Sequence, residues 1–353
     1  MSNNKILVAL SGGVDSSVAA IMLKEQGYDL IGITLRMYKS QFRSDPLEQS
    51  INDATILAGK LGIPYYVIDV SDEFEKTIIH NFIDEYQSGR TPNPCSLCNY
   101  RIKWKYLVEL ADEFGCDYIA TGHYAQIKEL KGRYYISKGV DGVKDQSYFL
   151  WRLSQDYLKR TMFPLGHYPK SEIKQIAEEE GFKIIAGKKE SYDVCFIPEG
   201  DYRDFIQQNH QLTSIKPKKG YFVSTNGEIL GEHKGIYNYT IGQRKGLGIA
   251  YSEPLYVTKI DVEDNLIVLG TENDLKSKVF YLETYNMSKY GHIPENTTVK
   301  IKIRYKSPEI EGKLSFVDDK LKVEPTKPIS AITPGQSAVF YEGDDLIGGG
   351  VIR

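Results

Sequence analysis

The chain is poor in several features that mark large classes of proteins. No apolar segment reaches the roughly 18 residues that a membrane-spanning helix needs, and the first residues, MSNNKILVAL, carry no cationic, apolar leader. Basic residues are not in excess, at 44 against 47 acidic ones, so a nucleic-acid partner must meet a local basic patch. Four cysteines in 353 residues are too few for a disulfide framework. We therefore expect a cytoplasmic protein without membrane contact, whose individual cysteines are candidates for chemistry.

Length and composition indicate a folded protein of more than one domain. A single core rarely serves 353 residues, and 41% hydrophobic with 26% charged residues is ordinary globular usage. In the first part of the chain, apolar strand-like runs alternate with helical patterns, at 5–10, 14–26, 30–35, 47–61, 65–70 and 117–123. This alternation predicts a parallel sheet covered by helices.

Beyond about residue 210 the pattern changes to short β-type runs. The runs YFVST, NLIVLG, VKIKIRY and SAVFYEG are separated by Gly, Asn, Asp and Pro, and long helical periods disappear. We expect three domains, an α/β domain at 1–209, a small β-rich domain at 210–270 and a second β-rich domain at 271–353.

A glycine-rich loop, SGGVDSS from Ser11 to Ser17, separates the first strand pattern from the first helix pattern. Glycines let the backbone turn tightly and present N–H groups, and the helix N-terminus adds positive partial charge, so the loop favours a bound phosphate. It is not a Walker A loop, because the lysine of GxxxxGK[ST] is absent. A plain strand-to-helix turn is the alternative, but the register of Ser, Gly, Gly, Asp and Ser favours the phosphate site.

Two cysteine-containing segments, GRTPNPCSLCN and SYDVCFI, are candidates for thiol chemistry. Two prolines keep the backbone before Cys95 out of a helix, so we expect a loop-to-helix junction where the helix N-terminus stabilises a thiolate. Cys195 lies in a loop-like segment that only folding can bring to Cys98. An inert buried thiol is the alternative for any one cysteine, and it is what we expect of Cys116 in the turn EFGCDYIA.

The most specific signal is a set of ordered blocks that spans the chain. They are SGGVDSSVAA, GRTPNP..LCN..IKW, DYIATGHYA, KDQSYFL, CFIPEGDYRDFI, GIYNYTIGQRKGLGI, RYKSP and AITPGQSAVFYEGD..IGGG. In these blocks the chain resembles the bacterial tRNA-specific 2-thiouridylases, a family of PP-loop ATP pyrophosphatases. The resemblance implies a parallel-sheet domain of the adenine nucleotide alpha hydrolase type, a β-rich central domain and a C-terminal β-barrel that contacts tRNA.

The resemblance also implies a reaction. Members of this family replace the C2 oxygen of the wobble uridine, position 34, with sulfur in tRNAs for lysine, glutamine and glutamate. ATP adenylates that oxygen while Mg²⁺ neutralises phosphate charge, and a cysteine desulfurase or sulfur-carrier relay loads a cysteine with persulfide. The base is expected to flip out of the anticodon stack. A disulfide closes the cycle and a reductant opens it.

The family's functional positions fall on particular residues of this sequence. Cys98 matches the nucleophile and Cys195 the persulfide carrier, while Asn93, Pro94 and Cys95 match the target-base region. The implied ATP-binding residues are Ala9, Leu10, Ser11, Gly12, Gly13, Val14, Asp15, Ser16, Leu35 and Gly122. The implied tRNA contacts are His123, Lys144, Asp145, Gln146, Arg304, Tyr305 and Gln336. We also expect a basic stripe on one face of a strand, or else a merely solvated sheet face, at Lys300, Lys302, Arg304 and Lys306.

The chain departs from the commonest family pattern at Cys95, where Asp is usual. A thiol substitutes poorly for a carboxylate in orienting a base or moving a proton. Cys95 is then a neutral replacement or a spare redox partner of Cys98. Alternatively, Cys95, Cys98 and Cys195 hold an iron–sulfur cluster whose free iron binds the sulfide to be transferred.

Two other classes of function stay open on the sequence. A different PP-loop ligase would share SGGVDSS but would have no need of Cys98 together with Cys195. A non-catalytic tRNA-binding protein would be expected to have lost the loop or one of these cysteines, and the sequence retains both.

Overall fold

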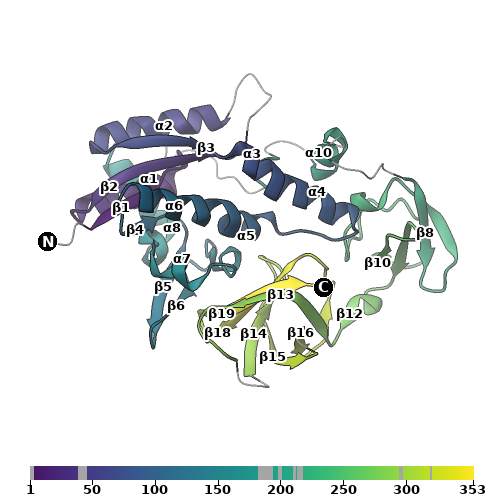
Figure 1. The fold of residues 1–353 in the computed structure, drawn as a ribbon. Coiled ribbons are helices and arrows are strands. Elements are labelled where there is room, and N and C mark those ends of the chain that lie inside the picture. The colour runs from purple at the N-terminus through teal and green to yellow at the C-terminus, as the bar shows by residue number, and fades with distance from the viewer. Residues whose placement is uncertain are drawn as a thin grey trace.

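The computed structural model describes residues 4–38, 46–181, 194–197, 201–209, 212, 218–293, 297–318 and 320–353. Figure 1 shows an N-terminal α/β part, a small β-rich part at its right and a barrel below the helices. Within the described ranges no helix is both long and apolar enough to span a membrane.

The N-terminal part is built on a parallel five-stranded sheet with the order β3-β2-β1-β4-β7. Its strands are β1 (Lys5–Ala9), β2 (Asp29–Arg36), β3 (Tyr65–Asp69), β4 (Tyr118–Ala120) and β7 (Thr161–Met162). β1 pairs in parallel with β2 on one side and β4 on the other, so the carboxyl ends of all three strands meet at one edge. The parallel α/β fold predicted for this part is confirmed.

Helices cover both faces of this sheet. Ile6 and Val8 of β1 join one hydrophobic cluster, while Leu7 between them joins another, because successive strand residues point to opposite faces. The helices are α1 (Val14–Glu25), α2 (Pro46–Leu61), α3 (Ser71–Phe74), α4 (His80–Gln87), α5 (Pro94–Cys98), α6 (Lys105–Glu113), α7 (Gln155–Lys159), α8 (Lys170–Glu179) and α10 (Tyr202–Gln208). Two π-helical segments, η1 (Glu75–Ile79) and η2 (Asn99–Trp104), join α3 to α4 and α5 to α6.

The second part is a four-stranded sheet with the order β10-β11-β8-β9 around its own hydrophobic cluster. Its strands are β8 (Gly220–Ser224), β9 (Ile229–His233), β10 (Tyr256–Asp261) and β11 (Leu266–Gly270). The short 3-10 turns η6 (Ile236–Asn238) and η7 (Asn273–Leu275) lie beside it. The expected boundary between 209 and 210 falls at residues that lie partly outside the described ranges.

The C-terminal part is the barrel that the resemblance implied. Its strands in spatial order are β13 (Phe280–Met287), β16 (Lys320–Pro325), β15 (Ile310–Val317), β14 (Thr297–Lys302), β18 (Ser337–Glu342) and β19 (Asp345–Ile352). β13 also pairs antiparallel with β19, which closes the sheet on itself. Two short strands, β12 (Lys276–Ser277) and β17 (Ile329–Ser330), pair with each other.

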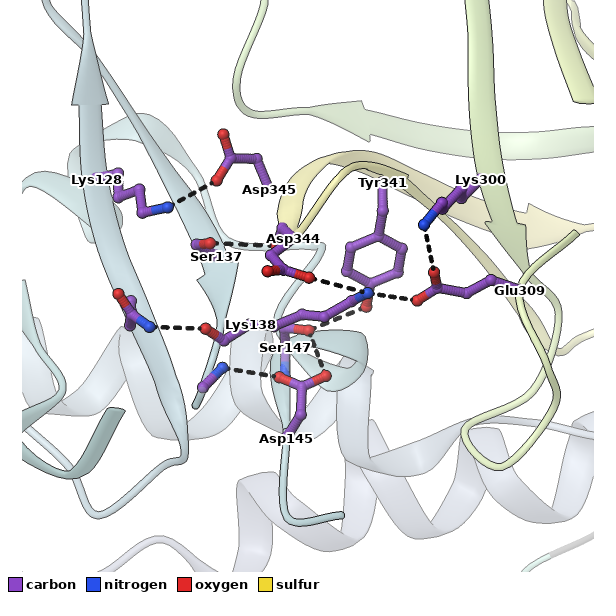
Figure 2. A network of polar contacts seen from close by, with 12 residues as sticks. Lys128, Ser137, Lys138, Asp145, Ser147, Lys300, Glu309, Tyr341, Asp344 and Asp345 are labelled. Carbon is purple, nitrogen blue, oxygen red and sulfur yellow. Dashed lines mark hydrogen bonds and ion pairs between the residues drawn. The ribbon is translucent and has the colours of Figure 1, made fainter. Parts of the chain in front are cut away.

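One feature of the α/β part was not expected from the sequence. The hairpin β5 (Ala125–Leu130) and β6 (Arg133–Lys138) extends the barrel sheet, because β6 pairs with β19 through Ser137 and Asp345. Lys128 on β5 also forms an ion pair with Asp345 at 3.0 Å (Figure 2). Residues that the sequence assigns to different domains therefore share one sheet, which ties the barrel to the α/β part.

Candidate active site

The glycine-rich loop lies at the carboxyl end of β1, where the chain turns into α1. The Ser11 backbone N–H donates to Ser16 Oγ at 3.0 Å, and Ser16 Oγ donates to the Gly13 carbonyl at 3.1 Å. Gly12 has a φ of +70°, a conformation that favours glycine. No described side chain caps the N-terminus of α1 at Gly13. The N-terminus of a helix favours a ligand of negative charge, so this end of α1 suits a phosphate.

The other implied ATP residues gather at the same edge of the sheet. Leu35 is buried near the end of β2, and Gly122 is the second residue after β4. A Cβ atom on Gly122 would lie 2.7 Å from backbone atoms of Asp15 and Ser16, so only glycine fits against the loop. Residues from three separate segments are therefore brought together around the carboxyl end of β1.

A lysine from a helix that is distant in sequence forms an ion pair with the acidic residue of this loop. Lys170, at the start of α8, places its Nζ 2.5 Å from Asp15 Oδ1, and the Tyr124 hydroxyl donates to the same oxygen at 2.7 Å. The Lys170 side chain is buried among these partners, with an exposed fraction of 9%. Sequence reasoning missed Lys170, because the only signal was the absence of a lysine in the loop itself.

The first cysteine segment forms the loop-to-helix junction that the prolines predict. Asn93 is the N-cap of α5, where its side chain accepts a hydrogen bond from the Ser96 backbone N–H at 3.3 Å, and Pro94 begins the helix. Cys95 lies in the first turn, whereas Cys98 ends α5 and the chain continues as helix into η2. Cys98 is therefore a full turn away from the helix N-terminus.

Cys98 lies next to the edge of the sheet that carries the glycine-rich loop. Its Sγ is 3.9 Å from the Sδ of Met37, which directly follows β2. Only 6% of the Cys98 residue surface is exposed. The thiol thus lies beside the end of β2, the strand that also carries the implied ATP contact Leu35.

Cys195 is brought to the same region by an aromatic anchor. The ring of its neighbour Phe196 packs against Phe74, Phe82 and Phe205, with ring centroids 5.7, 5.3 and 5.3 Å away. The residues Ser191, Tyr192 and Asp193 of the same motif lie outside the described residues. All four cysteines have free thiols, and Cys116 is buried in the turn between α6 and β4.

The expectation of a stabilised thiolate is wrong for this structure. Burial raises the pKa of Cys98 to about 12 and that of Cys195 to about 11, and each effect outweighs the opposing charge of Lys103. The thiols of Cys195 and Cys95 further raise the pKa of Cys98. Cys95 and Cys195 retain solvent access, but protein crowds their sulfur atoms and desolvation dominates. The three thiols lie within electrostatic reach of one another and are protonated at neutral pH.

The described residues give no support to the iron–sulfur interpretation. The described residues include all three cysteines, and among them no group of three His, Cys, Asp or Glu side chains is arranged to hold a metal ion. We therefore derive no step through a cluster.

Comparison with known proteins covers the chain from end to end. Three family models match it: tRNA methyl transferase HUP domain over residues 4–199, tRNA methyl transferase PRC-barrel domain over 203–271, and Aminomethyltransferase beta-barrel domain over 277–352. The chain is 46% identical to the tRNA-specific 2-thiouridylase MnmA of Amoebophilus asiaticus, over 100% of this chain and 96% of that protein. It is 46% identical to the protein of the same name from Cytophaga hutchinsonii, over 99% and 97%, and 44% identical to that from Acetivibrio thermocellus, over 100% of both. The chain belongs to the tRNA-specific 2-thiouridylase family. The resemblance inferred from the ordered blocks is confirmed.

In this 2-thiouridylase family member, His123 is packed as a neutral side chain. Its Nδ1 lies 2.8 Å from Thr121 Oγ1, and its ring is 5.5 Å from that of Trp104 and 6.1 Å from that of Phe163. Burial, with the charge of Lys103 acting in the same direction, lowers the pKa of His123 to about 3. His123 therefore cannot meet an RNA phosphate as a cation at neutral pH.

The implied tRNA contacts at 144–146 and 304–305 meet at the junction of the α/β part and the barrel. The Tyr305 ring packs on Phe149, with centroids 4.6 Å apart. The Asp145 carboxylate accepts from the Gly139 N–H at 3.2 Å and the Ser147 hydroxyl at 2.9 Å, and Ser147 Oγ is 3.0 Å from the Tyr341 hydroxyl (Figure 2). Asp145 is thus part of the domain junction.

Gln146 and Lys144 lie beside this junction in different ways. The Gln146 side-chain carbonyl accepts a hydrogen bond from the Tyr124 backbone N–H at 3.0 Å. This bond fixes the segment that follows Gly122, one of the implied ATP-binding residues. The positive charge of Lys144 acts on the hydroxyl of Tyr305 and opposes the rise in its pKa, which is caused mainly by burial. Lys144 is therefore near the aromatic cluster that joins the two parts.

The expected basic stripe is wrong at Arg304 and Lys306. Strand β14 ends at Lys302, so alternation on one strand face stops there. The Arg304 guanidinium turns inward and donates to the Ile241 carbonyl at 3.1 Å and to Thr333 Oγ1 at 2.7 Å. Arg304 thus bridges the barrel to the small β-rich part. Gln336, the last implied tRNA contact, instead reaches the cysteine segment, where it donates to two backbone carbonyls.

Proposed function

We propose that this protein is an ATP-dependent tRNA sulfurtransferase that replaces the C2 oxygen of the wobble uridine, position 34, with sulfur. The observation that carries the proposal is the position of Cys98. Its thiol lies 3.9 Å from Met37 at the end of β2, beside the edge where the glycine-rich loop opens. An activated base held over that loop would be within reach of a sulfur on this side of the sheet.

The ATP step is assigned to the loop and its neighbours. Ala9–Ser16, Leu35 and Gly122 would hold the nucleotide, with the phosphates at the N-terminus of α1. Mg²⁺ would accompany ATP and neutralise phosphate charge. Lys170, already at the loop through Asp15, would supply the positive charge that a Walker A lysine supplies elsewhere. The uridine C2 oxygen attacks the α-phosphorus, pyrophosphate leaves, and the base carries AMP on its C2 oxygen.

The sulfur step is assigned to Cys195 and Cys98. A persulfide on Cys195 attacks C2 directly, or Cys98 attacks that persulfide and releases sulfide that attacks C2. On the direct route AMP leaves with the former C2 oxygen and the base is held through an S–S bond to Cys195, until Cys98 attacks the Cys195 sulfur and releases the thiolated base. On the sulfide route the attack of Cys98 has already joined the two cysteines, and AMP leaves when sulfide adds to C2. Both routes end with a Cys98–Cys195 disulfide that an external dithiol reduces. Because the Cys98 thiol is protonated at rest, its attack must be coupled to loss of the thiol proton.

The remaining assignments follow from this reaction. The substrates would be tRNAs for lysine, glutamine and glutamate, and sulfur would come from a cysteine desulfurase directly or through carrier proteins. The reaction on tRNA would take place in the cytoplasm. Residues 1–209 would form the catalytic domain, 210–270 the central domain and 271–353 the tRNA-contacting barrel. Asn93, Pro94 and Cys95 would lie at the target base, with Cys95 as a neutral replacement for the usual Asp.

The test is a reconstituted thiolation reaction. Purified protein is incubated with ATP, Mg²⁺, a persulfide-loaded donor and unmodified tRNA transcripts, and the nucleosides are analysed by mass spectrometry. We expect 2-thiouridine at position 34 and pyrophosphate release that depends on tRNA. The mass of the product separates exchange of oxygen for sulfur from methylation, the chemistry in the name of the matching family model. Pyrophosphate release without tRNA and without any thiolated base would reject the proposal in favour of another ATP-dependent ligase.

A further inference from the structure

The barrel holds the segment that leads into the cysteine helix α5. The Thr91 backbone N–H donates to the Pro334 carbonyl at 2.9 Å. The Gln336 side-chain amide donates to the carbonyls of Thr91 and Pro92, both at 2.9 Å. An amide nitrogen carries two N–H donors, so both are used by the cysteine segment. Figure 1 shows this end of the barrel directly below the chain that joins α4 to α5.

The cap of the cysteine helix is also bonded to the barrel. Asn93, whose Oδ1 caps α5, donates from Nδ2 to Ser337 Oγ at 3.2 Å. Ser337 is the first residue of β18, and its Oγ accepts a second hydrogen bond from Trp151 Nε1 at 3.0 Å. The same side chain that fixes the start of the cysteine helix is therefore fixed by the barrel.

Close packing makes this contact specific. Gly335 has a φ of +89°, and a Cβ atom there would lie 2.9 Å from the Thr91 carbonyl oxygen. Arg90, the residue before Thr91, forms ion pairs with Glu85 of α4 and with Glu283 of barrel strand β13. Every residue from 90 to 93 thus has a polar contact with residues of the barrel or with a side chain that the barrel also holds.

We propose that Gln336 and Ser337 are positioning residues for sulfur transfer, which set the placement of α5 and its thiols through Thr91, Pro92 and Asn93. The barrel would then be part of the catalytic site in addition to seating tRNA. Cys98 lies one short helix away from the clamped residues, and a misplacement of about 1 Å can cost roughly 100-fold in rate. The inference rests on the proposed function, and it differs from the tRNA-contact role that the resemblance implies for Gln336.

The test uses Gln336→Glu in the full-length protein. The substitution keeps the shape of the side chain but turns a carboxylate toward two carbonyl oxygens, so it repels the cysteine segment. In the absence of tRNA we expect iodoacetamide to alkylate Cys98 roughly 10-fold faster, measured peptide by peptide with mass spectrometry, because the buried thiol gains access. With tRNA we expect kcat for thiolation to fall roughly 10- to 100-fold while KM for tRNA changes less than about 2-fold.

The matched control is Gln155→Glu. Gln155 also donates to two backbone carbonyls, those of Tyr134 at 2.8 Å and of barrel residue Ser288 at 3.1 Å, but it lies at another contact with the barrel. We expect its Cys98 alkylation and its kcat to match those of the wild type. Equal effects in both variants would overturn the proposal, since loosening of the barrel at any point would then suffice.

Two further outcomes decide the matter. Unchanged alkylation of tRNA-free Gln336→Glu, with the whole loss in KM for tRNA, would overturn the proposal and make Gln336 a tRNA contact only. If Gln336→Glu does not fold, Ser337→Ala removes only the bonds from Asn93 and Trp151, and we expect the same direction of change in alkylation and kcat. The alkylation measurements need no thiolation activity, so they decide this inference even if the wild-type protein fails the test of the proposed function.

Discussion

The ammonium of Lys170 lies 2.5 Å from the carboxylate of Asp15, although the two residues belong to helices at opposite ends of the α/β part of the sequence. Asp15 is in the first turn of α1, within the part of the glycine-rich loop motif that enters the helix, and Lys170 is the first residue of α8. The glycine-rich loop therefore has a lysine beside it in space, although its own sequence contains no lysine. This pair leads to the first prediction.

Lys170→Met should disable ATP use. The substitution keeps the length of the side chain and removes the charge, which leaves the Tyr124 hydroxyl as the remaining side-chain partner that the described residues give the Asp15 carboxylate. In the proposed site this carboxylate would then repel the nucleotide phosphates. We expect tRNA-dependent pyrophosphate release to fall by roughly 100-fold or more, in line with the loss of one preorganised charge. Filter binding should show tRNA affinity within about 2-fold of wild type.

The control for this variant is Lys24→Met, which removes an exposed cation from the last turn of α1. It should release pyrophosphate at the wild-type rate. Parallel loss of tRNA binding and pyrophosphate release in Lys170→Met would contradict the prediction, because it would mean that the pair only holds α8 on α1.

Cys98→Ser and Cys195→Ser should each abolish formation of 2-thiouridine, whereas Cys116→Ser should retain it. Cys98 and Cys195 lie within electrostatic reach of each other, whereas Cys116 is buried in a separate turn. The measurement is the yield of 2-thiouridine per tRNA by mass spectrometry. Pyrophosphate release should persist in both inactive variants, because adenylation of the base needs neither thiol. Full thiolation by Cys195→Ser would sink the two-cysteine mechanism.

The raised pKa of Cys98 predicts that the rate of its alkylation increases steeply with pH. With a pKa of about 12, the thiolate fraction of Cys98 grows about tenfold for each pH unit from 7 to 10. The rate of its alkylation in the substrate-free protein should follow that slope without a plateau below pH 10. A rate with its midpoint near pH 8.5 that levels off before pH 10, the behaviour of an ordinary thiol, would show that the site does not desolvate Cys98.

His123 predicts a loss of stability in acid. Its pKa is lowered to about 3 in the folded protein, against an ordinary value of 6.5, so between these pH values the unfolded chain binds more protons. The free energy of unfolding therefore falls as the pH drops below 6.5, by at most about 1.4 kcal/mol per pH unit from this group. His123→Asn should lose less stability than wild type between pH 7 and pH 5 in urea unfolding. Equal losses would contradict the assignment.

Local patterns in the sequence were sufficient for the frame of the site. Alternating strand and helix runs predicted the parallel sheet, the two glycines after β1 predicted the loop, and the prolines before Cys95 predicted where α5 begins. Each of these features depends on neighbours in the chain. Periodicity and turn chemistry report such features directly.

The contacts that give the site its chemistry are of another kind. Lys170 reaches Asp15, and Gln336 reaches Thr91, only after the sheet and the barrel are assembled, so no local pattern contains them. The direction of the Cys98 pKa shift was also mispredicted from sequence. The helix-terminus argument is local, whereas desolvation depends on how densely distant segments pack around the sulfur.

Cys95→Asp separates the persulfide interpretation from the cluster interpretation. Cys95 lies in the first turn of α5, where the helix N-terminus favours a carboxylate. If sulfur travels as a persulfide on Cys195, the variant should thiolate tRNA at the wild-type rate or faster, and the anaerobically purified wild type should be colourless and need a persulfide donor. The measurements are the visible spectrum, the iron content and the rate of 2-thiouridine formation. A brown, iron-loaded wild type that uses inorganic sulfide, with iron and activity both lost in Cys95→Asp, would decide for the cluster, because a carboxylate replaces a thiolate poorly as a cluster ligand.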